Sequence, residues 1–252
     1  MDIDSFDKIS FQYTTGQVPP PFCFRYVIDV SLVGKDKYEG KLELEYFDRD
    51  ELTEDEIFDE GFSLEDNFSW QGVIPKVWGD EVVERIKSTN WRKNLSANND
   101  GSEFLIKLYK NENGEVLQPS DINSWEMFMQ EIMQAVFELG KKEAPLMIGF
   151  SKNDKSQQIQ FDITYYFSRR CVDIIHNNNK KNIDWSEAQK LLKYIFGIDY
   201  VPEQGLEKLP KSHGAFISPG DGLWYLLNPE GGQGKEASKI KRLTDYMLTY
   251  IN

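Results

Sequence analysis

Residues 22–33 read FCFRYVIDVSLV, and the alternation within this stretch decides the fold class. Every second position carries an apolar or aromatic side chain: Phe22, Phe24, Tyr26, Ile28, Val30 and Leu32. After the turn GKDKYEG, residues 41–47 (KLELEYF) repeat the pattern with glutamates at the intervening positions. Two such runs joined by a short turn predict an antiparallel hairpin with one buried face and one solvent-exposed face.

Outward from this hairpin, the chain mixes strands and helices. We expect strands at 8–13, 103–110, 145–150 and 159–167, and two short strands within 214–228. We expect helices at 80–90, 121–142, 184–196 and 235–251. Because these elements do not alternate as regular βαβ units, the sequence predicts an α+β fold, with mostly antiparallel sheet or sheets flanked by several helices. We treat 1–252 as a single domain, with a division near 111–120 as the alternative.

The longest expected helix, 121–142, carries an apolar stripe. Its members recur at helical spacing: Trp125, Phe128, Ile132, Val136 and Leu139. A stripe of this kind is typical of a core rather than of a cofactor site, and no cofactor is expected.

The two cysteines, Cys23 and Cys171, lie in apolar runs and are expected to be buried free thiols. With no secretory signal or apolar run of membrane-spanning length in the sequence, we expect a cytoplasmic protein that does not enter a membrane.

Acidic residues are concentrated in one stretch, 48–66, which reads DRDELTEDEIFDEGFSLED and contains Arg49 as its only basic residue. Residues 1–70 carry 18 acidic and 6 basic side chains, a net charge of −12, whereas residues 71–252 carry 24 and 23, a net charge of −1. Such a region repels nucleic-acid phosphates and attracts basic partners. We therefore expect no nucleic acid as a ligand.

Local structure explains part of this acidity. Thr53 and Glu56 have the spacing of a helix capping box, and Gly61 stands where such a helix would end. Ser63 and Asp66 predict a second helix start. Capping does not explain the acids Glu43, Glu45, Asp59 and Glu60.

We interpret the remaining acids as a docking surface. The candidate partner-binding residues are Glu43, Glu45, Asp55, Asp59, Glu60, Phe62, Glu65, Asp66 and Trp70. Carboxylates steer a basic protein, and aromatic side chains supply binding energy. The primary hypothesis is a soluble intracellular protein-binding domain of the inhibitor or immunity type, directed at a basic enzyme. No catalytic signature accompanies it.

The alternative hypothesis is a hydrolase or a metal-dependent enzyme. Its candidate residues are Ser212, His213, Ser218 and Asp221, but no Gly-x-Ser-x-Gly motif accompanies them. Asp29 with Glu39 and Lys41 resembles the carboxylate and lysine pattern of restriction-type nucleases only weakly, because a hairpin with polar outward residues produces it by chance. With two histidines and no metal-ligand spacing, no metal site is expected.

A weaker candidate is the glycine-rich stretch GGQGKEASKIK at 231–241. Lys235 and Lys239 stand in the first turns of the helix expected there, where backbone amides favour an anion. Pro229 and Glu236 exclude a phosphate-binding P-loop. Positive charge near the N-terminal end of a helix is mildly unfavourable. An acidic side chain of the protein would offset the charge of the two lysines as well as a bound anion would. The sequence leaves the partner and the oligomeric state open.

Overall fold

The structure, a computed structural model, describes residues 6–34, 36–92, 101–111, 113–154, 158–228 and 235–251. These residues form two antiparallel sheets and five α-helices, which confirms the predicted α+β class. The chain divides after Glu143 into two units, 1–143 and 144–252. The stretch 111–120, which the sequence suggested as a place of division, lies within the first unit.

The first unit is built on a seven-stranded sheet. Its strands are β1 (Lys8–Thr14), β2 (Phe24–Leu32), β3 (Tyr38–Tyr46), β4 (Phe68–Ile74), β5 (Trp91–Arg92), β6 (Glu103–Lys110) and β7 (Asn113–Pro119). They lie in the order β4-β3-β2-β1-β6-β7-β5. Strands β2 and β3 form the hairpin predicted from the alternation, with Ile28 opposite Leu42.

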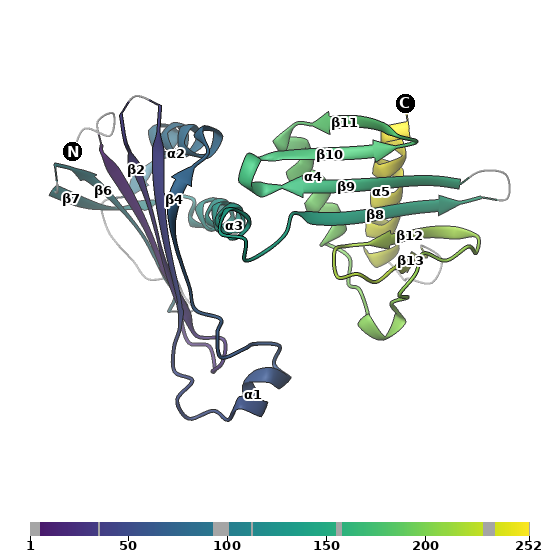
Figure 1. Cartoon of the computed structure of the whole chain (residues 1–252), viewed down its shortest axis with the longest axis horizontal. Helices are drawn as coiled ribbons and strands as arrows, with labels where there is room; N and C mark the ends of the chain where they lie inside the picture. Colours follow the sequence, from purple (N-terminus) through teal and green to yellow (C-terminus); the bar gives the residue numbers. More distant parts are fainter. Residues whose placement is uncertain are drawn as a thin grey trace. The chain divides into compact units, whose positions relative to one another are not determined.

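Two helices, α2 (Lys76–Ser88) and α3 (Ile122–Leu139), cover one face of this sheet (Figure 1). The four central strands each send a fully buried side chain to that face: Phe11, Ile28, Leu42 and Ile106. Helix α3 contributes Trp125, whose ring lies 5.7 Å from that of Phe11. The apolar stripe predicted for this helix is therefore core, as expected.

Helix α2 approaches the sheet closely at Gly79. A Cβ atom added to Gly79 would overlap the ring of Tyr38 in β3. That ring is held in place because the Tyr38 hydroxyl donates a hydrogen bond of 2.9 Å to Asp80. The contact therefore requires a residue without a side chain at position 79.

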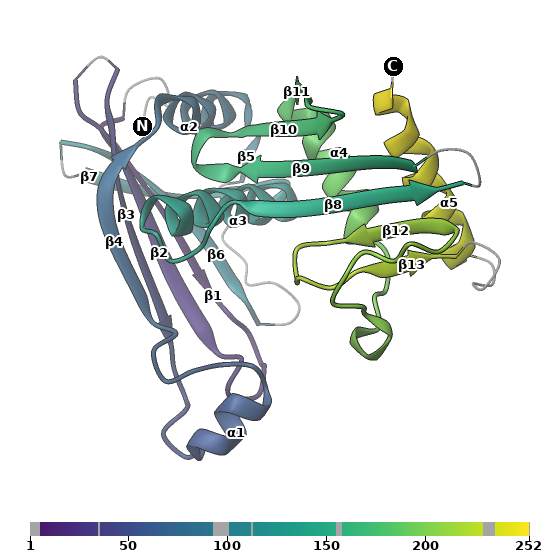
Figure 2. The ribbon, with the colours of Figure 1, turned by 45° about the vertical axis from the view of Figure 1, so that its right-hand side comes forward.

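The second unit has a six-stranded sheet in the order β11-β10-β9-β8-β12-β13. Its strands are β8 (Leu146–Asn153), β9 (Gln158–Tyr166), β10 (Cys171–His176), β11 (Asn179–Ile183), β12 (Gly214–Ser218) and β13 (Tyr225–Leu227). Helices α4 (Trp185–Ile195) and α5 (Lys235–Leu248) lie together on one face of it (Figure 2). Three short 3-10 turns complete the unit: η1 (Phe167–Arg169), η2 (Pro202–Gln204) and η3 (Thr249–Ile251).

Two local expectations for the second unit need correction. The spacing of Asp184 and Glu187 in the sequence predicts a helix cap, but Asp184 at the N-cap position of α4 makes no side-chain hydrogen bond there. Glu187 instead accepts a hydrogen bond of 2.8 Å from the Tyr250 hydroxyl. Both cysteines are free, but Cys23 is buried whereas Cys171 is only half-buried. In the part of the chain that the structure describes, no helix is long and apolar enough to cross a membrane.

Candidate functional site

Residues 48–66, here called the acidic tip, form a loop beyond the ends of β3 and β4 that carries the short helix α1 (Glu54–Asp59) (Figure 1). The predicted capping box is present. The Thr53 hydroxyl accepts a hydrogen bond from the Glu56 amide at 3.3 Å, and the Glu56 carboxylate accepts one from the Thr53 amide at 2.8 Å. The backbone hydrogen bond from Thr53 is the main reason that the pKa of Glu56 is lowered.

The other end of α1 also follows the prediction. Gly61 adopts φ +82°, which glycine accepts without steric cost. Its amide donates to the Phe58 carbonyl at 2.9 Å, and the Phe62 amide donates to the Ile57 carbonyl at 3.1 Å. These two bonds close the helix in a Schellman motif.

The second helix that we predicted at Ser63 does not form. The Asp66 carboxylate accepts hydrogen bonds from the Ser63 amide at 2.9 Å and from the Ser63 hydroxyl at 2.8 Å. This closes a tight turn, after which the chain enters β4. The prediction was wrong because the same serine and aspartate spacing that caps a helix also closes an isolated turn.

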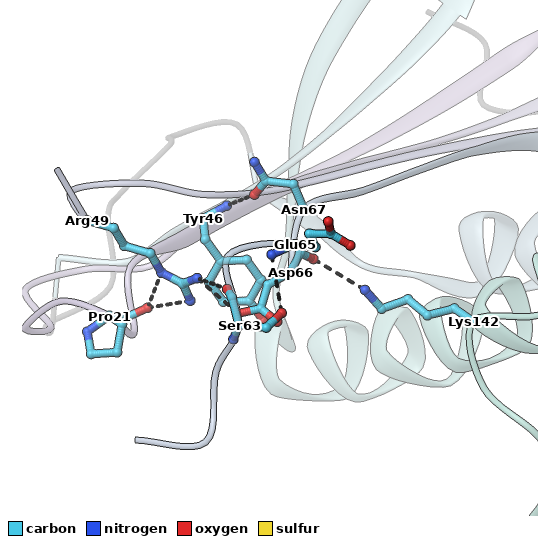
Figure 3. Close-up of polar contacts among 8 residues, drawn as sticks. All are labelled: Pro21, Tyr46, Arg49, Ser63, Glu65, Asp66, Asn67 and Lys142. Atoms are coloured by element: carbon cyan, nitrogen blue, oxygen red, sulfur yellow. Dashed lines mark hydrogen bonds and ion pairs between the residues drawn. The ribbon is translucent and has the colours of Figure 1, made fainter. Parts of the chain in front are cut away.

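Arg49 is the structural centre of the acidic tip. Its side chain is only 13% exposed. Its guanidinium donates to the Pro21 carbonyl at 2.9 and 3.1 Å, to the Ser63 carbonyl at 3.1 Å and to the Asp66 carboxylate at 2.9 Å (Figure 3). The Arg49 side chain therefore links its own segment to the segment at Pro21 and to the turn at 63–66.

Aromatic rings complete the packing around Arg49. The guanidinium lies 4.2 Å from the ring centroid of Tyr46 and 4.8 Å from that of Phe62. The Phe62 ring also makes an edge contact with Phe22, with centroids 5.3 Å apart. Phe62 is thus half-buried inside the tip. Trp70 is half-buried as well, with its ring over the backbone of Gly40 and Gly72.

The two strand acids of the predicted docking set have partners within the sheet. Glu43 pairs with Lys41 at 2.5 Å, two residues away on the same face of β3. Glu45 accepts two hydrogen bonds from Arg25, its direct neighbour on β2, at 2.6 and 2.8 Å. Pairing with a basic neighbour, on the same strand for Glu43 and on the adjacent strand for Glu45, thus accounts for these two acids, which helix capping had left unexplained.

Besides Glu56 of the capping box, eight acids of the tip are exposed, and none of them has an ion pair with a described residue: Asp48, Asp50, Glu51, Glu54, Asp55, Asp59, Glu60 and Glu65. Between them lie two exposed apolar side chains, Phe58 at 49% and Leu64 at 55%. Leu64 did not belong to the docking surface that we predicted from the sequence. A six-residue helix can bury only one side, and Ile57 takes the buried position, so its neighbour Phe58 is forced outward.

Asp66 gives the acidic tip a pH dependence. Desolvation opposes its ionised form, but the hydrogen bonds from Ser63 and Arg49 outweigh this effect and hold its pKa below the usual range. A carboxyl whose pKa is depressed on folding adds stability above its unfolded pKa, which is about 3.9, and that stability is lost as the pH falls through the folded pKa.

We therefore expect the unfolding free energy of the wild type to fall more steeply with acidification than that of Asp66→Asn. Above about pH 5 the variant should show a constant deficit, because the wild-type carboxylate is fully ionised there. Below about pH 4 the two curves should converge. Urea unfolding between pH 3 and 7 measures both. Curves that stay parallel throughout would show that folding does not lower the pKa of Asp66.

The hydrolase candidates are not brought together. His213 precedes β12 and Ser218 ends it, so the extended strand separates them by roughly 16 Å. Asp221 accepts hydrogen bonds from the Tyr225 hydroxyl at 2.5 Å and from the Leu223 amide at 3.0 Å, in a turn of its own. Ser212 and His213 are exposed, and the nearest carboxylate to the His213 ring is that of Asp154, at 3.7 Å.

Lys239 of α5 has an acidic neighbour in the chain itself. Lys239 lies 2.9 Å from Glu236, and this hydrogen bond raises the pKa of Lys239 and lowers that of Glu236. Lys235 is exposed at the first residue of the helix. Residues 231–234 of the glycine-rich stretch lie outside the described residues. Across the described ranges, no three histidine, cysteine or acidic side chains are grouped so as to hold a metal ion.

Comparison with known proteins gave no match, whether to family models, to curated proteins or to solved structures. Of the candidates, the acidic tip alone combines a fixed backbone, exposed carboxylates and exposed apolar side chains. These are the elements of a protein-docking surface.

Proposed function

We propose that this chain is a protein-binding module that docks a basic protein partner through its acidic tip. The observation that carries the proposal is the exposure of Phe58 and Leu64 among eight carboxylates without ion-pair partners in the described chain. Exposed charge accelerates encounter with an oppositely charged partner, and large apolar side chains supply most of the affinity once contact is made.

The network around Arg49 supports the same proposal. Ordering a loop on binding costs free energy that a loop already fixed does not lose. Here the capping box, the Schellman motif and the Arg49 contacts fix the loop before any partner arrives. A rigid array of carboxylates of this kind can imitate nucleic-acid phosphates, so an inhibitor or immunity-type role against a basic enzyme is the form of binding that we propose.

The test begins with charge reversal of Asp59→Lys and Glu60→Lys together. Both acids stand at the C-terminal end of α1, where negative charge is unfavourable, so the double variant should keep its fold and gain about 0.3–1 kcal/mol per site at most. Proteins captured by the wild type should be retained poorly by this variant. The association rate of a captured partner should fall at least several-fold and lose its steep dependence on salt.

The matched control is Glu203→Lys with Glu207→Lys, which changes the net charge equally at two exposed acids of the second unit. It should bind as the wild type does. The second half of the test is Phe58→Ala with Leu64→Ala, which should raise the dissociation rate about tenfold, while the equally exposed Leu226→Ala should not. Equal, salt-insensitive rates for all variants would show that the acidic tip is only a solvated surface.

A further inference from the structure

The four terminal strands of the two sheets are not equally protected. Strand β5 has two residues and β13 has three, which is too short to template another strand. Strand β11 carries Lys180 and Lys181, and lysine is a common device against edge-to-edge pairing. Strand β4 has seven residues, FSWQGVI, with no charge and no proline. Strand β4 therefore has neither the short length nor the charged residues that protect the other three terminal strands.

The outer side of β4 is available to another strand. Within the described residues β4 pairs with β3 alone, so every second residue of β4 turns its backbone N–H and C=O groups away from the sheet. Ser69 and Gln71 are exposed, and Val73 is 54% exposed. Main-chain groups in such a row provide the hydrogen bonds by which some proteins add a partner's strand to a sheet.

The net charge of the first unit indicates which kind of segment would bind at the edge of β4. The first unit has 30 acidic and 15 basic side chains, a net charge of −15. The acidic tip ends at Asp66, two residues before β4 begins, so a segment lying along β4 continues directly onto the tip (Figure 2). A second copy of the chain would bring two units of charge −15 together. A lysine- or arginine-rich segment is attracted instead.

We propose that the free edge of β4 accepts an extended basic segment of the partner as an eighth strand of the first sheet. This inference rests on the proposed function, since it states how the partner that contacts the acidic tip is held. Side chains of an added strand alternate between the two faces of the sheet. Those on the helix-covered face meet the half-buried Phe68 and Trp70, and those on the other face meet Ser69 and Gln71. An alternating basic and apolar sequence therefore fits best.

The probe is a ten-residue peptide of alternating lysine and valine, added to the full chain at low salt. Its control is the diastereomer with D-valine at every valine position, which has the same charge and composition but cannot form a regular strand beside an L-sheet. The L-peptide should bind about tenfold more tightly than the control, because only it forms the main-chain hydrogen bonds. It should also slow amide hydrogen exchange within 68–74.

A variant pair tests the edge from the protein side. Val73→Lys places a lysine on β4 and should weaken binding of the L-peptide about tenfold. Val116→Lys makes the same charge change on β7 and should leave binding unchanged. If both peptides bind equally, depend on Asp59 and Glu60, and leave 68–74 unprotected, the docking proposal stands and strand addition is overturned.

Two further outcomes would overturn the inference in other ways. If neither peptide binds at low salt, the proposed function fails together with the inference. If the chain sediments as a dimer that Val73→Lys dissociates, a second copy occupies the edge and the basic segment does not.

Discussion

Replacing Arg49 with methionine lowers the free energy of unfolding by about 3 kcal/mol in our expectation. Methionine keeps most of the apolar stem but removes every donor. The Asp66 carboxylate and the carbonyls of Pro21 and Ser63 then lose their shared partner in a largely buried place. Leaving a charge buried without its partner costs more than the original pair contributed. Chemical denaturation followed by circular dichroism measures the loss.

The matched control is Arg25→Met. Arg25 also pairs with a carboxylate, Glu45, but both side chains are about half exposed, and such pairs contribute about 0–1 kcal/mol. Arg49→Lys should fall between the two, because lysine keeps the charge but cannot present the planar fork that reaches several acceptors at once. A loss for Arg49→Met no larger than that for Arg25→Met would mean that the acidic tip holds its shape without this arginine.

The second large effect is expected at Gly79→Ala, with a net loss of about 2–3 kcal/mol. Alanine favours a helix over glycine by about 1 kcal/mol, so propensity alone predicts stabilisation. The opposite sign is expected because the new methyl group overlaps the Tyr38 ring, which its hydrogen bond to Asp80 prevents from swinging aside. Helix α2 must then move away from the sheet.

A double-mutant cycle with Tyr38→Leu isolates this contact. The smaller and more flexible leucine should accommodate the methyl group, so that Gly79→Ala costs much less in that background than in the wild type. Thermal unfolding of the four proteins provides the comparison. Equal costs in both backgrounds would place the strain somewhere other than at Tyr38.

Local sequence patterns were sufficient for much of the fold. The alternation of 22–33 and 41–47 predicted the β2–β3 hairpin and its buried face, and the spacing of Thr53 and Glu56 predicted the capping box. These features depend on residues close in sequence, whose geometry follows from one period or one hydrogen-bond ring.

Features that depend on contacts distant in sequence were missed. Strand β4 alternates in the required way, with Phe68 and Trp70 on one face and Ser69 and Gln71 on the other, but Trp70 was assigned to a docking surface. The pairing of Glu45 with Arg25 depends on the strand register. The role of Arg49 depends on a loop 28 residues away that brings the Pro21 carbonyl to it.

The bare edge of β4 also bears on how the protein stays in solution. A long, uncharged edge strand is a template for ordered aggregation, and soluble proteins usually place gatekeeper residues on it. Here the charges lie elsewhere in the same unit, so they can protect the edge only through the long range of their repulsion. At about 1 M salt this range shrinks to about 3 Å. High salt, more than heat, is therefore the condition under which this protein is expected to form β-rich aggregates, with β4 as their seed.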